Sequence, residues 1–184
     1  MDGIMTTDDW TRLRRLCRVM QTVTTVGICL IALAVTLAFI IPDWTRNLLL
    51  ARLGQAGADL PLTPGRLAAA AAITSVPVGI MLYGLWQARQ LFAGFAAGEV
   101  FTLASARRLR DFAAAMLAQA VLGPLSSTAL ILAFTFANPP GERRLTIALS
   151  SNDYIALIVG GVLLAVAWVM VEASRIAEEH ASFV

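Results

Sequence analysis

The chain has 184 residues, of which 58% are apolar and only 14% are charged, whereas an average soluble domain has about 25% charged residues. The formal net charge is +2, from fourteen basic and twelve acidic residues, so the sequence lacks the basic excess typical of a nucleic-acid-binding domain. The composition therefore argues against a soluble domain and against direct nucleic-acid binding, and it favours an integral membrane protein.

Four stretches between successive charges have about the length of a transmembrane helix, which needs about 20 mostly apolar residues. They predict membrane spans over about residues 19–41, 67–90, 112–136 and 154–172. The fold class is therefore all-α. We expect one membrane domain, residues 1–184, built as a polytopic four-transmembrane-helix bundle.

The orientation follows from the arginines, because the chain contains no lysine. Nine arginines lie on the side of the two termini and five on the other side. The positive-inside rule then places both termini in the cytoplasm. The first span is preceded by arginines, as in a signal peptide, but its apolar stretch is too long and no small-x-small cleavage site follows it. We expect an uncleaved, multi-pass protein of the bacterial inner (cytoplasmic) membrane.

The segments between the spans also carry structural signals. The outer loop 42–66 begins with DWTRNLLLARLG, which predicts a short helix in the membrane interface. A second outer loop covers 137–153. After the fourth span, the tail 173–184 is expected to continue as a cytoplasmic helix, since Arg175 stands three and four residues before two glutamates.

The cytoplasmic turn 91–111 is the most informative of these segments. The second helix is expected to run to about Ala97, because Gly98 supplies the residue type that ends a helix. Thr102 is a suitable N-cap for the next helix, which is expected to restart at Leu103. This turn therefore joins the two central spans as a compact helical hairpin.

The four spans, the segment GEVFTLASARRLR and the acidic helical tail together resemble the bacterial four-helix integral membrane family catalogued as a domain of unknown function, number two-nine-seven-five. The resemblance covers about residue 15 to the end, and this chain departs from the pattern at Ala104 and Ser105, where an acidic residue or asparagine is common. The matching residues are Phe92, Gly98, Phe101, Thr102, Arg108 and Leu109. The resemblance implies no catalytic residue or cofactor. Some relatives look as if they are encoded beside small helix-turn-helix regulators, which would make the turn and the tail a docking surface.

Several kinds of chemistry are excluded by what the sequence lacks. The four charge-free windows contain no Asp, Glu, His, Lys or Arg, whereas a proton-coupled transporter or an intramembrane enzyme needs such side chains at membrane depth. The single His180 excludes bis-histidine haem and the HExxH zinc motif. Cys17 and Cys29 lie about 18 Å apart on one helix and cannot pair within a chain. We expect no enzymatic activity, no catalytic residue, no metal and no cofactor.

Two prolines fall near the bilayer midplane, and hydroxyl side chains accompany both of them. In one interpretation the hydroxyls satisfy backbone carbonyls at the kinks, while small residues such as Gly79 and Gly161 let helices pack closely. In the other, the kinks open a cavity for a lipid or a small apolar ligand. The spacing of small residues favours the first interpretation. The candidate ligand-pocket residues are Thr74, Ser75, Pro77, Gln119, Pro124, Ser126 and Ser127.

The function predicted from these features is a non-enzymatic sensor or regulatory scaffold that presents a cytoplasmic surface to a soluble partner, such as a small helix-turn-helix regulator. The candidate partner-binding residues are Gly98, Phe101, Thr102, Arg107, Arg108, Arg110 and Arg175. The arginines would equally suit anionic lipid headgroups.

Two alternative functions stay open. One is a small transporter or membrane-complex subunit that binds a lipid or lipophilic ligand between kinked helices. The other is an immunity-type protein against a membrane-active peptide. The expected partners are membrane lipids and a cytoplasmic regulator protein, with a homo-oligomer as a further candidate and no direct nucleic acid.

Overall fold

The computed structural model describes residues 7–41, 64–100, 102–135 and 150–181. These residues contain four long helices and no strand, which confirms the all-α class. The helices are α1 (Thr7–Ile40), α3 (Pro64–Ala97), α4 (Leu103–Thr135) and α5 (Ser151–Ala181). The predicted interfacial helix of the loop 42–66, Phe101 and most of the loop 137–153 lie outside the described residues.

Each of the four helices is long and apolar enough to cross a membrane, as the sequence predicted. The candidate spans are Trp10–Ala38, Ala68–Ala97, Leu103–Ala133 and Ser151–Ile176. The helices extend beyond the charge-free windows, because the charged flanks are helical as well. The arginine-rich segment before residue 19 belongs to α1, and the segment after residue 172 belongs to α5. The second helix ends at Ala97 and the third begins at Leu103, as the turn residues predicted.

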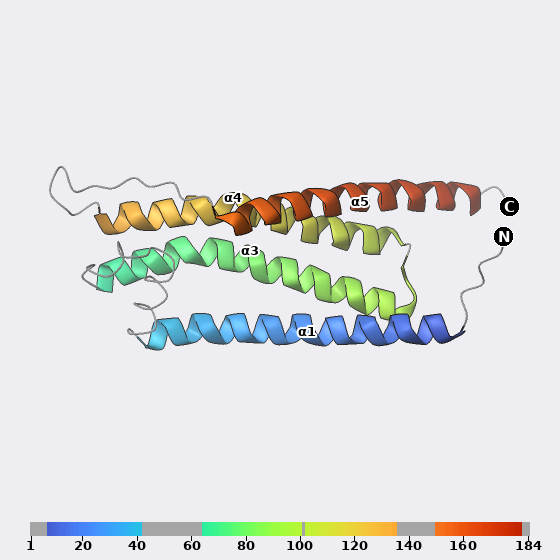
Figure 1. The fold of residues 1–184 in the computed structure, drawn as a ribbon, viewed down its shortest axis with the longest axis horizontal. Coiled ribbons are helices and arrows are strands. Elements are labelled where there is room, and N and C mark those ends of the chain that lie inside the picture. Colours follow the sequence, from blue (N-terminus) through green and yellow to red (C-terminus); the bar gives the residue numbers. More distant parts are fainter. Residues whose placement is uncertain (1–6, 42–63, 101, 136–149, 182–184) are drawn as a thin grey trace.

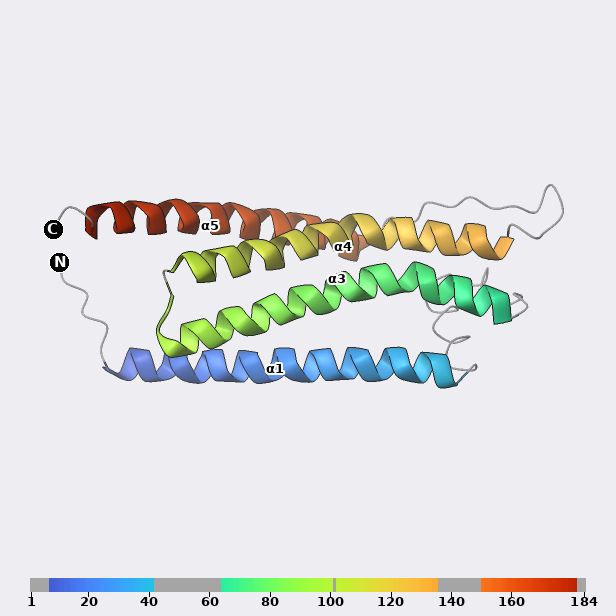
Figure 2. The same ribbon diagram turned by 180° about the vertical axis from the view of Figure 1, so that it is seen from behind.

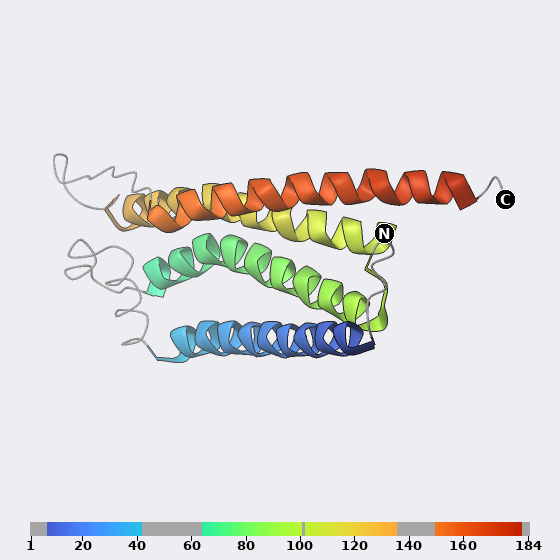
Figure 3. The same ribbon diagram turned by 45° about the vertical axis from the view of Figure 1, so that its right-hand side comes forward.

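The helices pack in chain order as an open layer (Figure 1; Figure 2). α1 packs against α3, α3 against α4, and α4 against α5, while in the described parts of the chain α1 contacts neither α4 nor α5. The same order is visible after a 45° rotation (Figure 3). The start of α1, the α3–α4 turn and the end of α5 lie at one end of the layer, which we call the turn end.

The sequence predicted a four-helix bundle, and in the structure the described helices form an open layer with α1 and α5 at its edges. In water, closing a bundle stabilises it by removing apolar surface from the solvent. In a membrane, apolar helix faces can contact lipid tails without a free-energy penalty, so helix association depends on packing and polar contacts instead. The edge helices accordingly bury little. Cys17 is the one buried residue of α1 among those whose exposure is described, and α5 exposes large side chains such as Trp168 and Val169.

Glycines set how closely the central helices approach. A Cβ atom built on Gly84 of α3 would lie 2.9 Å from the Cβ of Ala115 on α4. One built on Gly160 of α5 would lie 3.0 Å from Cγ of Leu117 on α4. In contrast, Gly79 and Gly161 meet nothing within 4 Å, so their assignment to close packing is wrong for contacts within the chain. Glycine was correctly predicted at close helix contacts, but the glycines that make these contacts are Gly84 and Gly160.

A small apolar core joins three helices near the turn end. It consists of the buried residues Leu91, Leu109 and Ala167, one each from α3, α4 and α5. Phe95, Leu163 and Met170 pack around it as partly buried neighbours. This cluster lies where α3, α4 and α5 come together, about two turns from the α3–α4 turn.

Candidate functional site

The α3–α4 turn is a hydrogen-bonded helix terminus built on Gly98. The N–H of Gly98 donates to the carbonyl of Phe95 over 3.1 Å, and the N–H of Glu99 donates to the carbonyl of Gly94 over 3.0 Å. These two bonds form a Schellman motif. Gly98 has a φ of +92°, a backbone conformation that favours glycine because it has no Cβ. The prediction that Gly98 ends the helix is confirmed.

The start of α4 is capped by Thr102, also as predicted. The hydroxyl of Thr102 accepts a hydrogen bond from the N–H of Ser105 over 3.2 Å and donates to Oγ of Ser105 over 3.1 Å. Oγ of Ser105 in turn donates to the carbonyl of Glu99 over 2.7 Å. Ser105 is only 1% exposed. The cap and the preceding turn therefore form one hydrogen-bonded unit.

Sequence reasoning overlooked Ser105, although its position carried a signal. It stands three residues after the N-cap, where a polar side chain commonly reaches back toward the preceding segment. Because its hydroxyl bonds the carbonyl of Glu99, it connects the beginning of α4 to the end of the Schellman motif. Ser105 is thus a structural residue of the turn.

Arg108 crosses from α4 to α3 within the same unit. Its Nη1 atom donates to the carbonyl of Gln90 over 3.1 Å. A Cβ on Gly94 would lie 3.4 Å from that nitrogen and 3.4 Å from Oγ of Ser105, so a glycine at this position leaves room for both side chains. Three of the predicted partner-binding residues, Gly98, Thr102 and Arg108, therefore hold the turn together.

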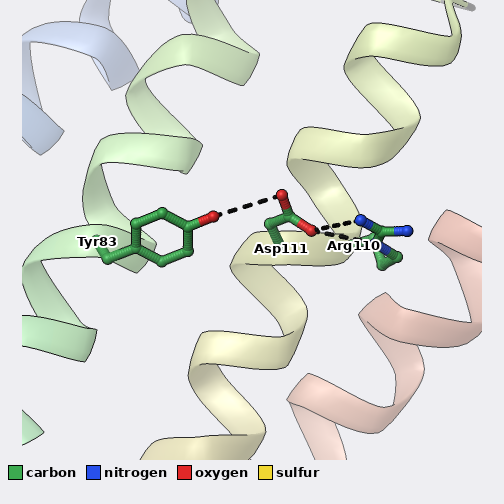
Figure 4. A network of polar contacts seen from close by, with 3 residues as sticks. All are labelled: Tyr83, Arg110 and Asp111. Carbon is green, nitrogen blue, oxygen red and sulfur yellow. Dashed lines mark hydrogen bonds and ion pairs between the residues drawn. The ribbon is translucent and has the colours of Figure 1, made fainter.

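The other charged candidates lie around this unit. Arg110 pairs with its neighbour Asp111, whose Oδ1 atom accepts from Nε over 3.1 Å and from Nη2 over 3.0 Å. The second oxygen of Asp111 accepts from the hydroxyl of Tyr83 on α3 over 3.5 Å, so the carboxylate lies between the two helices (Figure 4). The Arg110 and Asp111 side chains are 49% and 30% exposed, and a pair that accessible to solvent stabilises the fold by about 1 kcal/mol at most.

Arg107 and Arg175 complete the predicted set. Arg107 is exposed. Arg175 lies on α5, where Nη1 is 3.9 Å from Oε2 of Glu172, and both side chains are more than half exposed. Phe101 lies outside the described residues. The structure therefore brings together the turn residues of the predicted site, with the remaining arginines at its periphery.

A polar link between α1 and α3 was not predicted. Nε of Arg89 on α3 donates to Oγ1 of Thr25 on α1 over 3.1 Å. The Arg89 guanidinium also lies 5.2 Å from the ring centroid of Trp86, which is within the range of a cation–π interaction. Nothing in the local sequence pairs residues 64 positions apart. Only the packing of α1 against α3 brings them together.

The candidate ligand-pocket residues lie in two neighbouring helices, and their hydroxyls donate locally. Thr74 donates to the carbonyl of Ala70 over 2.7 Å, and Ser126 donates to that of Leu122 over 2.6 Å. Ser75 and Ser127 likewise donate to carbonyls of their own helices. These bonds favour the interpretation in which hydroxyls satisfy backbone carbonyls.

Gln119 makes the one contact that joins the candidate pocket residues across helices. Its side-chain Nε2 on α4 donates to the carbonyl of Pro77 on α3. Both Pro77 and Pro124 are buried. This amide therefore bridges the two central helices close to a proline kink, as a packing contact would.

In the described parts of the chain, no group of three or more histidine, cysteine, aspartate or glutamate side chains gathers in a way that could hold a metal ion. The polar groups of the turn are occupied in hydrogen bonds that stabilise it. The turn end therefore presents exposed charged side chains, among them Glu99, Arg107 and Arg110, on a hydrogen-bonded turn.

The sequence model of a family described as "Protein of unknown function (DUF2975)" matches residues 50–184. The match covers α3, α4 and α5 and begins after α1, whereas the resemblance was expected to begin at about residue 15. No curated protein and no solved structure matches the chain.

Proposed function

The chain belongs to the DUF2975 family, and from this premise we propose that it is a non-enzymatic regulatory scaffold or sensor of the bacterial inner membrane. Both termini and the turn end of the layer are assigned to the cytoplasm, on the basis of the arginine distribution. A soluble partner, such as a small helix-turn-helix regulator, binds the turn end and is thereby held at the membrane.

One observation carries this proposal: a network of hydrogen bonds joins the end of α3 to the start of α4 on either side of the turn. The Schellman bonds, the Thr102 cap and the Arg108 bridge all converge on the same few residues. A surface that is ordered before binding loses less conformational entropy when a partner docks. Exposed Arg107 and Glu99 then provide charges of both signs for recognition.

The experiment compares Arg107→Glu with the matched control Arg12→Glu. Both residues are exposed arginines near the turn end, but Arg12 lies on α1, outside the region that matches the family. Each full-length variant is reconstituted in lipid nanodiscs and used for quantitative affinity purification. We expect a specific partner to be retained by the unchanged protein and by Arg12→Glu, and to be lost from Arg107→Glu.

Two results would contradict the proposal. Equal retention by both variants would show that Arg107 does not contribute to a docking surface. Equal loss from both would show that the protein merely attracts anionic molecules through its overall charge. A photo-crosslinker placed at position 107 identifies the bound chain in the same preparation.

The transporter alternative has less support. Each serine and threonine among the candidate pocket residues donates to a carbonyl of its own helix. A ligand would have to compete with those bonds. Ligand-dependent thermal stabilisation that is abolished by Ser126→Leu would revive the transporter alternative.

A further inference from the structure

Arg89 is the arginine of α3 that contacts α1, and it has no acidic partner in the described parts of the chain. Its Nε atom donates to Oγ1 of Thr25 over 3.1 Å, and its guanidinium lies 5.2 Å from the ring centroid of Trp86. The described arginines that form ion pairs are Arg110 and Arg175. Arg89 is only partly exposed. A charged group that is partly withdrawn from water is unfavourable without a counter-ion, so this position favours a bound anion.

Neither α1 nor α3 supplies that anion. Residues 10–41 and the whole of α3 contain no aspartate or glutamate. On the far side of α3, the carboxylate of Asp111 is engaged by Arg110 and by Tyr83 (Figure 4). The first half of α1 instead adds further arginines, which are Arg12, Arg14, Arg15 and Arg18. The junction of α1 and α3 is therefore basic, and its counter-ion must come from outside these two helices.

The contact with Thr25 leaves the phosphate-binding edge of Arg89 available. Arginine has five N–H donors, and Thr25 accepts the one on Nε; no acceptor among the described residues is bonded to the Nη atoms. The hydroxyl of Thr25 donates in turn to the carbonyl of Gln21 over 2.7 Å, which fixes its orientation on α1. The two Nη nitrogens form the planar fork that binds a phosphate group through two parallel hydrogen bonds. Thr25 is thus a positioning residue for Arg89.

Exposed tryptophans place Arg89 at the level of lipid headgroups. Trp86, one turn away on α3, is 49% exposed. Trp168 of α5 is 71% exposed, and its neighbour Ala167 belongs to the same apolar core as Leu91. Trp168 and Arg89 therefore lie at nearly the same depth. Because tryptophan is enriched at the interface between membrane and water, Arg89 lies in the region that the headgroups occupy.

A second arginine extends this surface toward the turn end. Arg18, Thr22 and Thr25 recur at helical spacing, so they share one side of α1. Arg18 is exposed and lies about 10 Å along the helix from Thr25. The surface therefore carries positive charge at two depths, one level with Trp86 and one nearer the solvent. This arrangement suits a lipid headgroup, which extends from the interface into the solvent, better than a single free ion.

From these observations we propose that Arg89, Arg18 and Thr25 form a binding site for an anionic phospholipid at the junction of α1 and α3. The Nη fork of Arg89 binds the phosphate, and Arg18 binds the part of the headgroup nearer the solvent. The lipid adds a contact at the edge of the layer, where α1 contacts only α3 within the described residues. The site shares no residue with the proposed docking surface, so it does not depend on the proposed function.

Quenching of Trp86 by brominated lipids tests this site. Trp10→Phe, Trp44→Phe and Trp168→Phe in the full chain leave Trp86 as the single tryptophan. The protein is reconstituted in vesicles of phosphatidylglycerol and phosphatidylethanolamine in equal amounts, with one of the two lipids brominated. We expect phosphatidylglycerol to be favoured beside Trp86 by about fivefold. The matched control retains only Trp168, which lies at nearly the same depth on α5 and should be quenched equally by both lipids.

Substitutions of Arg89 separate this site from general electrostatic attraction. Arg89→Gln should abolish the preference at Trp86, and Arg89→Lys should retain only part of it, because lysine keeps the charge but lacks the fork. Arg12→Gln is the matched control, since it removes the same charge about 20 Å along α1 from Thr25, and it should leave the preference unchanged. Equal quenching of Trp86 by the two lipids in the chain with Arg89, as expected if a carboxylate of another protein were the counter-ion, would overturn the proposal. So would a preference that persists in Arg89→Gln.

The positioning role of Thr25 has its own control. Thr25→Val should lower the preference at Trp86 about twofold or more, since Arg89 loses its acceptor, and Thr25→Ser should restore it. Thr36→Val, which removes a hydroxyl bonded to the carbonyl of Ala32 on the same helix, should have no effect. An equal loss in both valine variants would contradict the assignment of Thr25. Loss of the preference on addition of inorganic phosphate would show that a free ion occupies the site, and would overturn the lipid proposal.

Discussion

Close packing between α3 and α4 makes a quantitative prediction at Gly84. A methyl group added there would stand 2.9 Å from the Cβ of Ala115, whereas carbon atoms in favourable contact are about 3.5–4.0 Å apart. The helices must therefore separate by about 0.6–1.1 Å, or the neighbouring side chains must shift. Overpacking of this kind typically costs about 1–3 kcal/mol.

Gly79→Ala provides the matched control for Gly84→Ala. Both glycines lie in the interior of α3, but Gly79 has nothing within 4 Å of its added methyl group. The intrinsic gain of about 1 kcal/mol for replacing a helical glycine with alanine applies to both, so it cancels in the comparison. The free energy of unfolding of Gly84→Ala should therefore be lower than that of Gly79→Ala by about 1–3 kcal/mol.

The measurement is reversible unfolding of the full chain in mixed micelles with increasing sodium dodecyl sulfate, followed by circular dichroism. A further variant, Ala115→Gly in the Gly84→Ala chain, removes the clashing partner, so a double-mutant cycle should show favourable coupling between the two positions. Equal unfolding free energies for Gly84→Ala and Gly79→Ala would refute the argument that this glycine is required by helix approach.

Three further substitutions test the polar contacts. Ser105→Ala should lower the free energy of unfolding by about 1–2 kcal/mol, because the buried Ser105 hydroxyl loses its hydrogen bonds with Thr102 and with the carbonyl of Glu99. The exposed Ser75→Ala should have almost no effect, and a similar loss in both would contradict the assignment. Gly98→Ala should cost about 1 kcal/mol or more at a φ of +92°, with faster hydrogen exchange of the amides at 98 and 99; unchanged exchange would count against the Schellman motif. Gln119→Leu should lower the free energy of unfolding by about 0.6–1.7 kcal/mol in the same micelle assay, the range for a hydrogen bond between membrane helices. No measurable change would show that this hydrogen bond does not stabilise the contact between α3 and α4.

The local features of the turn could be predicted because each depends on residues close together in the chain. Gly98 and Thr102 have side chains suited to a helix end and a helix start, so their roles were predicted and are confirmed by the hydrogen bonds. The role of Ser105 was missed, since its bond to Glu99 requires the chain to reverse direction first. Arg108 was predicted as a partner-binding residue, and the structure adds a local role that the sequence did not predict, since its guanidinium donates to a carbonyl of the preceding helix.

The amino-acid sequence by itself determined the number of long apolar helices found in the described residues, their approximate ends and their suitability for a membrane, because these depend on charge-free length and on local capping residues. The tertiary structure alone decided which glycines lie in contacts, which polar groups pair across helices, and that the helices form an open layer. Such features depend on how one helix is rotated and shifted against the next. In lipid, many rotations are acceptable to an apolar surface, so a few close contacts and hydrogen bonds between distant residues select among them.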